Sequence, residues 1–524
     1  MAKLGTSIGC FVGRKRALAL GASSGALCLA LGLMPVAAAA QEAQAEADSD
    51  SGAIVITGSR IATDGMKAPV PVTVLQADEV EALSPGALIN GVSQMPQFSN
   101  NATLNGGGTV FTRASYGALN LRGLGVNRTL TLLNGRRVPS SSAFGGVDIN
   151  LFPEAMIQAV ETTTGGASAA YGSDAVAGVV NFKLDTRFTG IELAAQANVT
   201  SRGDNPGYEV SGAYGTAFGG DRGHVLVSAE YRREDGIFTL AGRDWYQGWG
   251  TVGTGTQADP YRFVPDVFSA NGSFDGIIHA PGTAIDRLQF DPDGNAAPFV
   301  PGAILQGGTG LSGARTTGGS ADDFNADIYA LTPDAERVSA FAYADYEFGE
   351  GVKVFAQYMF GQNKVFTQDR SGSLIAGLGP GGAGGPGTVT IFSGNPFLPA
   401  SVQALMSANN IGSFLLRRRG HSSDIGNGYF QDDTAQHIAT AGFNLDLGSS
   451  WGIDGFYQYG TSRRNWAQGS IRLDRIYAAL DAVVDPATGN TVCRVSQTAA
   501  GAAAFPGCVP LNLFGRGNAS AAAV

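Results

Sequence analysis

The sequence predicts an α+β domain near its N-terminus, followed by antiparallel strands of a transmembrane β-barrel. Beyond residue 186, apolar and polar side chains alternate in segments of about ten residues, long enough to cross a bilayer as tilted strands. Only 15% of the 524 residues are charged and 76 are glycine, which suits strands between lipid and a polar lumen. A soluble β-sandwich is the alternative, but its strands are usually shorter, at about five or six residues.

The first 40 residues are predicted to form a secretory signal peptide. Basic residues lie between Lys3 and Arg16, Ala17–Met34 is apolar, and Ala38–Ala40 offers a small-residue cleavage site. A transmembrane helix is the alternative, because the apolar run is nearly long enough to span a bilayer. The alanine-rich end of the run favours cleavage. Residues 41–52 are acidic and rich in alanine, so we expect them to form a disordered linker.

The stretch that follows is interpreted as short strands and turns. The run Thr129–Leu133 is apolar and partly β-branched, and Asn134-Gly135 tolerates positive φ, so a strand and a tight turn are expected. Apolar residues three and four apart predict one or two helical turns within Leu151–Ala159. Val176–Phe182 is predicted to be a short buried strand. Three further elements are expected upstream, an extended segment and two short helices: Pro69–Leu75, Asp78–Leu83 and Gly86–Val92.

Three motifs in this stretch occur in a fixed order: Asn120-Leu121-Arg122-Gly123, Leu132-Leu133-Asn134-Gly135, and Tyr171-Gly172 followed by Gly178-Val179-Val180-Asn181. In order and spacing they resemble the plug domain of TonB-dependent outer-membrane receptors. A dinucleotide loop is not supported, because no helix or acidic partner follows at the right distance. The resemblance implies a plug domain over residues 61–186 and the N-terminal part of a barrel over 187–524.

One departure from the family concerns contact between plug and barrel. Many members carry Arg-Gly-Pro where this chain has Thr164-Gly165-Gly166, so an ion pair through that arginine is in doubt. Arg122 remains as the candidate for a plug–barrel contact.

The segment 53–60 is short and prone to form a strand, with the core Ala53, Ile54, Val55, Ile56 and Thr57. It could simply be the first strand of the plug. The resemblance implies instead that it is the TonB box, which binds TonB and its inner-membrane energising complex. An extended segment can add to the edge of a partner's sheet through main-chain hydrogen bonds.

Two polar loops of the plug carry candidate ligand contacts. Aromatic and polar groups on loops over a rigid scaffold suit ligand binding, although ordinary loop filling is the alternative. The resemblance implies that both loops face outward. The candidates are Phe111, Arg113, Tyr116 and Phe144.

After the plug, about seven segments alternate over spanning length. In the segment around Val227, for example, Val225, Val227 and Ala229 share one face while Ser228 and Glu230 share the other. The short turns 348–352 and 448–451 are predicted to be periplasmic. Three long connections are predicted to be extracellular loops: 236–333, 367–433 and 465–524.

Cys493 and Cys508 close a short loop, and in an exported protein we expect them to form a disulfide. The four histidines are scattered, so a metal site is not expected, and no cofactor is predicted. Asp291–Asn295 superficially suggests a calcium loop but lacks the later glutamate, so a turn is expected.

The sequence therefore predicts a receptor in the cell outer membrane, surrounded by lipid, that imports a scarce siderophore, vitamin, saccharide or peptide with energy from TonB. The alternative is a passive channel or a surface-binding protein without energy coupling. No enzyme motif supports catalysis. The formal net charge of −10 argues against nucleic acid as a partner.

We also expect the chain to be the N-terminal part of a longer receptor. Seven strands cannot close around a plug of this size, since plugged transporters use barrels of about 22 strands. The segment from Asn512 to Val524 also lacks the alternation and terminal aromatic residue with which family members end.

Overall fold

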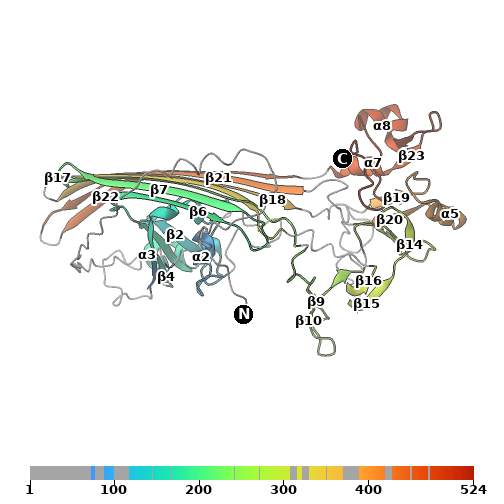
Figure 1. Cartoon of the computed structure of the whole chain (residues 1–524), viewed down its shortest axis with the longest axis horizontal. Coiled ribbons are helices and arrows are strands. Elements are labelled where there is room, and N and C mark those ends of the chain that lie inside the picture. The colour runs from blue at the N-terminus through green and yellow to red at the C-terminus, as the bar shows by residue number, and fades with distance from the viewer. Residues whose placement is uncertain are drawn as a thin grey trace, which may run out of the picture.

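The computed structural model describes the residues 72–76, 79, 88–99, 117–143, 145–165, 167–240, 242–270, 272–306, 315–320, 330–349, 351–369, 389–418, 428–448, 451–469 and 472–523. They form a small mixed domain, a long curved sheet above it, and a folded unit beyond one end of that sheet (Figure 1). The predicted signal peptide, the linker and the segment 53–60 lie outside the described residues.

The small domain is built on a five-stranded sheet with the order β1-β4-β5-β2-β3. β2 and β5 are parallel, and the other neighbouring pairs are antiparallel. The helix α2 (Leu88–Val92) lies within the predicted helix Gly86–Val92, and α3 spans Ser168–Tyr171. The strands are β1 (Val72–Gln76), β2 (Thr129–Leu133), β3 (Arg136–Arg137), β4 (Ile157–Thr164) and β5 (Gly178–Leu184).

One predicted element of this domain ends earlier than expected. Single 3₁₀ turns at Ile149–Leu151 and Glu154–Met156 replace the helical turns predicted within Leu151–Ala159, and β4 begins at Ile157. The reason is that β4 is rich in β-branched residues and pairs with both β1 and β5. Of the predicted helix Asp78–Leu83, only Glu79 lies among the described residues.

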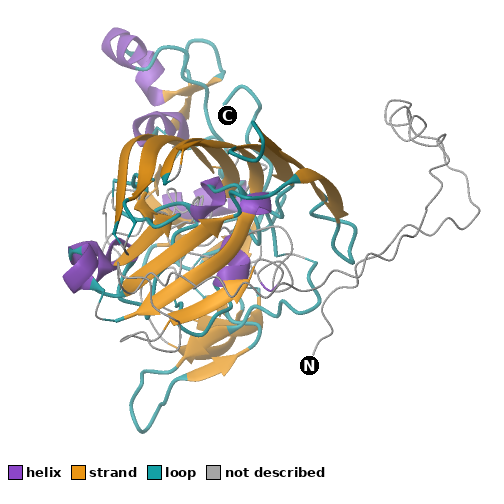
Figure 2. Cartoon of the chain, turned by 90° about the vertical axis from the view of Figure 1, so that its left-hand side faces the viewer, coloured by secondary structure: helices purple, strands orange, loops and turns teal. Residues whose placement is uncertain are grey.

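The long sheet has seven antiparallel strands, in the order β22-β21-β18-β17-β8-β7-β6, as the count of alternating segments predicts. It arches over the small domain (Figure 2). In the described part of the chain, the edge strands β6 and β22 do not pair with each other, so the sheet stays open. Its strands are β6 (Gly190–Asn198), β7 (Gly207–Phe218), β8 (Gly223–Glu234), β17 (Asp334–Gly349), β18 (Val352–Asp369), β21 (Gly428–Asp446) and β22 (Gly452–Gln468).

The two faces of the long sheet differ as the alternation predicts. On β8, Ser228 and Glu230 are buried against the small domain, whereas Val227 on the opposite face is exposed. On β17, Ser339 and Asp345 are buried in the same way. The inner face is thus largely polar and the outer face apolar, which is the arrangement of a membrane barrel wall.

The three long connections contain strands and helices, and their extracellular location stays a prediction. Strands from the first two connections share one five-stranded sheet, and the third adds a helix to the same hydrophobic core. We call this assembly the loop unit. Because β18 extends to Asp369 and β21 begins at Gly428, the second connection is also shorter than predicted. The sheet and helices of the loop unit are β14 (Ala296–Pro298), β13 (Leu288–Phe290), β12 (Ile277–His279), β20 (Ser413–Arg417), β19 (Val389–Phe392), α5 (Ala400–Ala408) and α7 (Leu473–Leu480).

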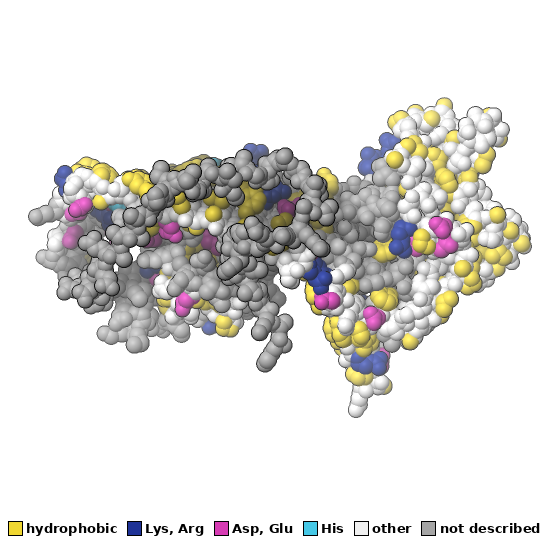
Figure 3. Space-filling model, in the orientation of Figure 1, with side chains coloured by type: hydrophobic (Ala, Val, Ile, Leu, Met, Phe, Trp, Pro, Cys, Tyr) yellow, Lys and Arg dark blue, Asp and Glu magenta, His cyan; other side chains and the backbone are white. Residues whose placement is uncertain are grey.

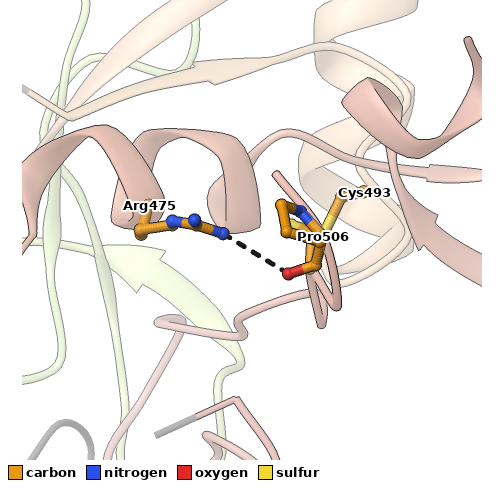
Figure 4. The surroundings of a disulfide bond; sticks show 4 residues. Arg475, Cys493 and Pro506 are labelled. Carbon is orange, nitrogen blue, oxygen red and sulfur yellow. Dashed lines mark hydrogen bonds between the residues drawn. A yellow bond between two sulfur atoms is a disulfide. The ribbon is translucent and has the colours of Figure 1, made fainter. Parts of the chain in front are cut away.

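The disulfide expected from the sequence lies in the loop unit. Cys493, at the end of β24 (Thr491–Cys493), is bonded to Cys508, with an S–S distance of 2.14 Å. β24 pairs with β23 (Ala482–Val484), and α8 (Ala499–Ala504) lies within the closed loop. Arg475 Nη1 donates to the Pro506 carbonyl oxygen at 3.4 Å beside the bridge (Figure 4).

Smaller sheets occupy the rest of the first connection. β9 (Gly250–Val252) pairs with β10 (Arg262–Val264), and β16 (Arg315–Gly319) pairs with β11 (Phe268–Ser269) and β15 (Pro301–Gln306). The segment Asp291–Asn295 is a turn, closed by the Asp291 N–H donating to the Asn295 carbonyl at 2.9 Å.

Across the described ranges, the structure contains no helix with the length and apolar character needed to cross a membrane.

Candidate functional site

The candidate site is the interface between the small domain and the inner face of the long sheet. It begins at the hairpin β2–β3, where Asn134 and Gly135 have φ of 50° and 73°. Two side-chain contacts fix this turn to β5. The Gly135 N–H donates to Asn181 Oδ1 at 2.7 Å, and Asn134 Oδ1 accepts from the Leu184 N–H at 2.8 Å. These contacts explain why an Asn-Gly pair and an asparagine in β5 occur together.

The hairpin directs Arg136 into the sheet. Its guanidinium lies 4.7 Å from the ring centre of Phe355 and 5.1 Å from that of Phe456. Nη1 also donates to Gln357 Oε1 at 3.1 Å. The neighbouring backbone is held as well, because Gln458 Nε2 donates to the Arg137 carbonyl at 2.6 Å. A basic hairpin tip is therefore anchored to β18 and β22 by cation–π and hydrogen-bond contacts.

A row of apolar side chains crosses the largely polar inner face. Five strands each contribute one buried residue that joins the core of the small domain. From the small domain, Phe152 and Phe182 belong to the same core, and their rings meet edge to face at 5.2 Å between centres. The two parts thus share one core. The row consists of Ala213, Leu226, Phe341, Met359 and Ile438.

A buried charge cluster lies beside this row. Arg337 on β17 pairs with Glu230 on β8, and its Nη1 is 2.6 Å from Glu154 Oε2 on the small domain. Arg337 and Glu230 are only 5% and 4% exposed. The Ala155 N–H donates to Glu230 Oε2 at 3.3 Å. One arginine therefore compensates two carboxylates, and removing it would leave the buried Glu230 and the partly exposed Glu154 without a counter-charge.

A second buried carboxylate joins the two parts. Asp148, which is fully buried, accepts hydrogen bonds from the Gly117 N–H at 2.8 Å, the Asn150 N–H at 3.1 Å and Asn363 Nδ2 on β18 at 3.2 Å. Burial raises the pKa of Asp148, although these three hydrogen bonds oppose the rise.

Two glycines allow close backbone approaches, one between the small domain and the wall and one within the small domain. A Cβ on Gly361 of β18 would lie 2.1 Å from the Leu151 carbonyl oxygen, so the small domain touches the wall there. A Cβ on Gly178, whose φ is +141°, would lie 2.2 Å from the Thr163 carbonyl oxygen. Any larger side chain at either position would force the backbones apart.

The contacts found here differ from the one predicted. The side chain of Arg122 is exposed, and its N–H donates to the Gln97 carbonyl at 2.7 Å, within the small domain. Its role as a plug–barrel contact stays a prediction. Phe111, Arg113, Tyr116 and Phe144 lie outside the described residues, as do Ala53–Thr57. The Arg-Arg pair after Asn134-Gly135 was a visible signal for the anchor at Arg136, whereas nothing in the sequence marked Arg337.

The family-model comparison decides what this domain is. Residues 64–179 match the model described as TonB-dependent Receptor Plug Domain. Residues 64–179 are therefore a plug domain of the kind found in TonB-dependent receptors. The small domain is accordingly the plug, and the arched sheet is the wall that holds it. Receptors of this family lie in the outer membrane, so the predicted location and the predicted fold class are confirmed.

Solved structures of several receptors are similar to part of this chain. The siderophore receptor PirA from Pseudomonas aeruginosa is 10% identical, with a TM-score of 0.32, over 77% of this chain and 53% of that one. The siderophore receptor PiuA from Acinetobacter baumannii is 12% identical, with a TM-score of 0.33, over 78% and 49%. This chain therefore spans about half the length of those proteins.

Among the described residues, no three His, Cys, Asp or Glu side chains are grouped so that they could hold a metal ion.

Proposed function

We propose that this receptor imports a scarce ligand across the outer membrane, and that TonB supplies the energy by pulling on Ala53–Thr57. The observation that carries the proposal is the plug itself, which shares a core and a buried charge cluster with the wall. A passive channel has no need of such an element. TonB with its inner-membrane complex, outer-membrane lipid and a small or oligomeric ligand are the proposed partners.

The chemistry of the interface suits a plug that moves under load. Buried polar groups on the wall, such as Gln357, Asn363 and Gln436, can exchange their plug contacts for water at little net cost. The five apolar residues of the row have no such replacement, because water contact with apolar surface is unfavourable. The row and the charge cluster therefore resist spontaneous movement, and an external pull overcomes them. Phe111, Arg113, Tyr116 and Phe144 are proposed ligand contacts, and Arg122 a proposed contact to the barrel.

The test replaces Ile56 with proline, which removes one main-chain donor from the strand that TonB would pair with. A cysteine at Val55 should cross-link to TonB in cells, and Ile56→Pro should abolish this cross-link. Ile56→Pro should also abolish uptake while leaving surface binding intact. The control is Ala45→Pro, which changes the acidic segment upstream. Undiminished cross-linking and uptake in Ile56→Pro would reject energy coupling through this segment and favour a passive channel or surface-binding protein.

A further inference from the structure

Four aromatic side chains are exposed on the connection between β8 and β17. Tyr261 is 70% exposed and Phe263 is 67% exposed, and Trp245 and Trp249 are also exposed. Trp249, Tyr261 and Phe263 lie on or next to the hairpin β9–β10, and Trp245 is five residues before β9. We call these four residues the aromatic platform. Large aromatic groups gathered at the surface usually mark a place where another molecule binds.

The aromatic platform is preorganised by packing. The rings of Trp249 and Phe263 are stacked, with centres 5.3 Å apart and planes 8° apart. Tyr261 covers Gly255, where an added Cβ would lie 2.6 Å from its ring. Beneath the hairpin, Val267 is buried and lies against Gly250. Fixed flat rings offer contact area at a low cost in conformational entropy.

The position of the hairpin argues against contact with the membrane. β9 and β10 lie beyond the loop end of the sheet and on the same side as the plug, not on the outer apolar face (Figure 1). The space-filling view shows hydrophobic side chains gathered on the protrusion that contains them (Figure 3). The aromatic platform is therefore placed where an external ligand would approach the plug, away from the surface that faces lipid.

The charges around the aromatic platform narrow the class of ligand. Residues 242–270 contain two arginines, three aspartates and no lysine. Arg262 Nη2 is 3.3 Å from Asp259 Oδ1, and Arg243 pairs with Asp204. The surface thus has no surplus positive charge with which to attract an anion. Beside the rings lie hydroxyls that can donate and accept, with the Thr254 and Thr256 oxygens 3.2 Å apart.

We propose that the aromatic platform binds a neutral oligosaccharide. The apolar C–H faces of sugar rings stack on flat aromatic side chains, and sugar hydroxyls match the threonine hydroxyls and the aspartate oxygens at the edge of the hairpin. A neutral ligand fits the charge balance, whereas an anionic metal chelate does not. This inference rests on the proposed import function and names the ligand class for it.

Tryptophan fluorescence gives a direct binding test, because the chain has four tryptophans and two belong to the aromatic platform. In the full chain with Trp451→Phe and Trp466→Phe, the signal comes from Trp245 and Trp249. The probes are neutral gluco-, xylo-, manno-, galacto- and chito-oligosaccharides, with a ferric catecholate complex as the anionic comparison. At least one oligosaccharide should change the fluorescence with saturation, and the ferric complex should not.

Site specificity is tested with two matched variants. Phe263→Leu keeps apolar bulk but removes a ring of the stack, and it should weaken oligosaccharide binding by about tenfold. The control is Phe348→Leu, because Phe348 is 66% exposed at the opposite end of the sheet and should leave binding unchanged.

The inference is overturned if no oligosaccharide binds, if only the ferric complex binds, or if Phe263→Leu and Phe348→Leu bind equally. Energy-coupled import of a different ligand would overturn it while leaving the proposed function intact. Conversely, oligosaccharide binding that Phe263→Leu weakens, together with import that Ile56→Pro leaves unchanged, would support this site and reject the proposed function.

Discussion

The plug and the loop unit each have a hydrophobic core, but the two cores are assembled differently. The plug contributes residues between Leu88 and Leu184, and the wall adds one row of apolar side chains. The core of the loop unit gathers residues from Ile278 to Phe514, taken from three connections that the wall strands separate. The plug is therefore local in sequence and held by the wall, whereas the loop unit is non-local and holds itself together.

The largest effect is expected when the charge cluster between the plug and the wall is broken, compared with breaking an ion pair inside the loop unit. Arg337→Met leaves the buried Glu230 and the partly exposed Glu154 without a counter-charge, and should destabilise the plug–wall interface by about 3–5 kcal/mol. The control is Arg494→Met in the loop unit, whose half-exposed pair with Asp481 contributes about 0–1 kcal/mol. Denaturant unfolding of both variants measures the difference. Equal losses would contradict the assigned role of the charge cluster.

The motifs of the plug could be predicted because its signals are local. Asn134-Gly135 specifies a hairpin, and the run Thr129–Leu133 is a strand in any register. The seven wall strands also followed from alternation alone. The pairing of β12 with β20 could not be predicted, because it joins Ile277 to Arg417 across two wall strands, β17 and β18.

The contacts between the inner face of the wall and the plug could not be predicted from the sequence for a related reason. Leu226, Phe341 and Met359 are apolar residues among polar neighbours on the inner face, so the alternation of the sequence does not reveal that they join the core of the plug. Similarly, Arg337 looks like any lumen-facing arginine until Glu154 is placed opposite it. Such pairs depend on the docking of the plug, which no local pattern encodes.

A smaller effect is expected from the disulfide. Replacing both Cys493 and Cys508 with serine opens a loop of 15 residues, which in the chain-entropy model costs about 3 kcal/mol. Because the bridge lies wholly within the loop unit, amide exchange should accelerate in α7 and remain slow in β2. Faster exchange in β2 would show that the two cores are coupled.

The smallest effect is a pH dependence at Asp148. Its raised pKa means that the folded state binds this proton more readily than the unfolded state. The cost of burying the charge is therefore present above the folded pKa, and it is relieved as pH falls through that value towards about 3.9. Relative to Asp148→Asn, the wild-type chain should gain stability on acidification. A difference between the two that does not vary with pH would show that the carboxylate is not strained by burial.

The central proposal is that TonB moves the plug relative to the wall. A cysteine at Leu151, which is fully buried and touches the wall at Gly361, reports this movement through labelling by a maleimide in cells. Labelling should be faster in cells with TonB than in cells without it, and Ile56→Pro should reduce it to the rate without TonB. Equal labelling in all three cases would contradict the account.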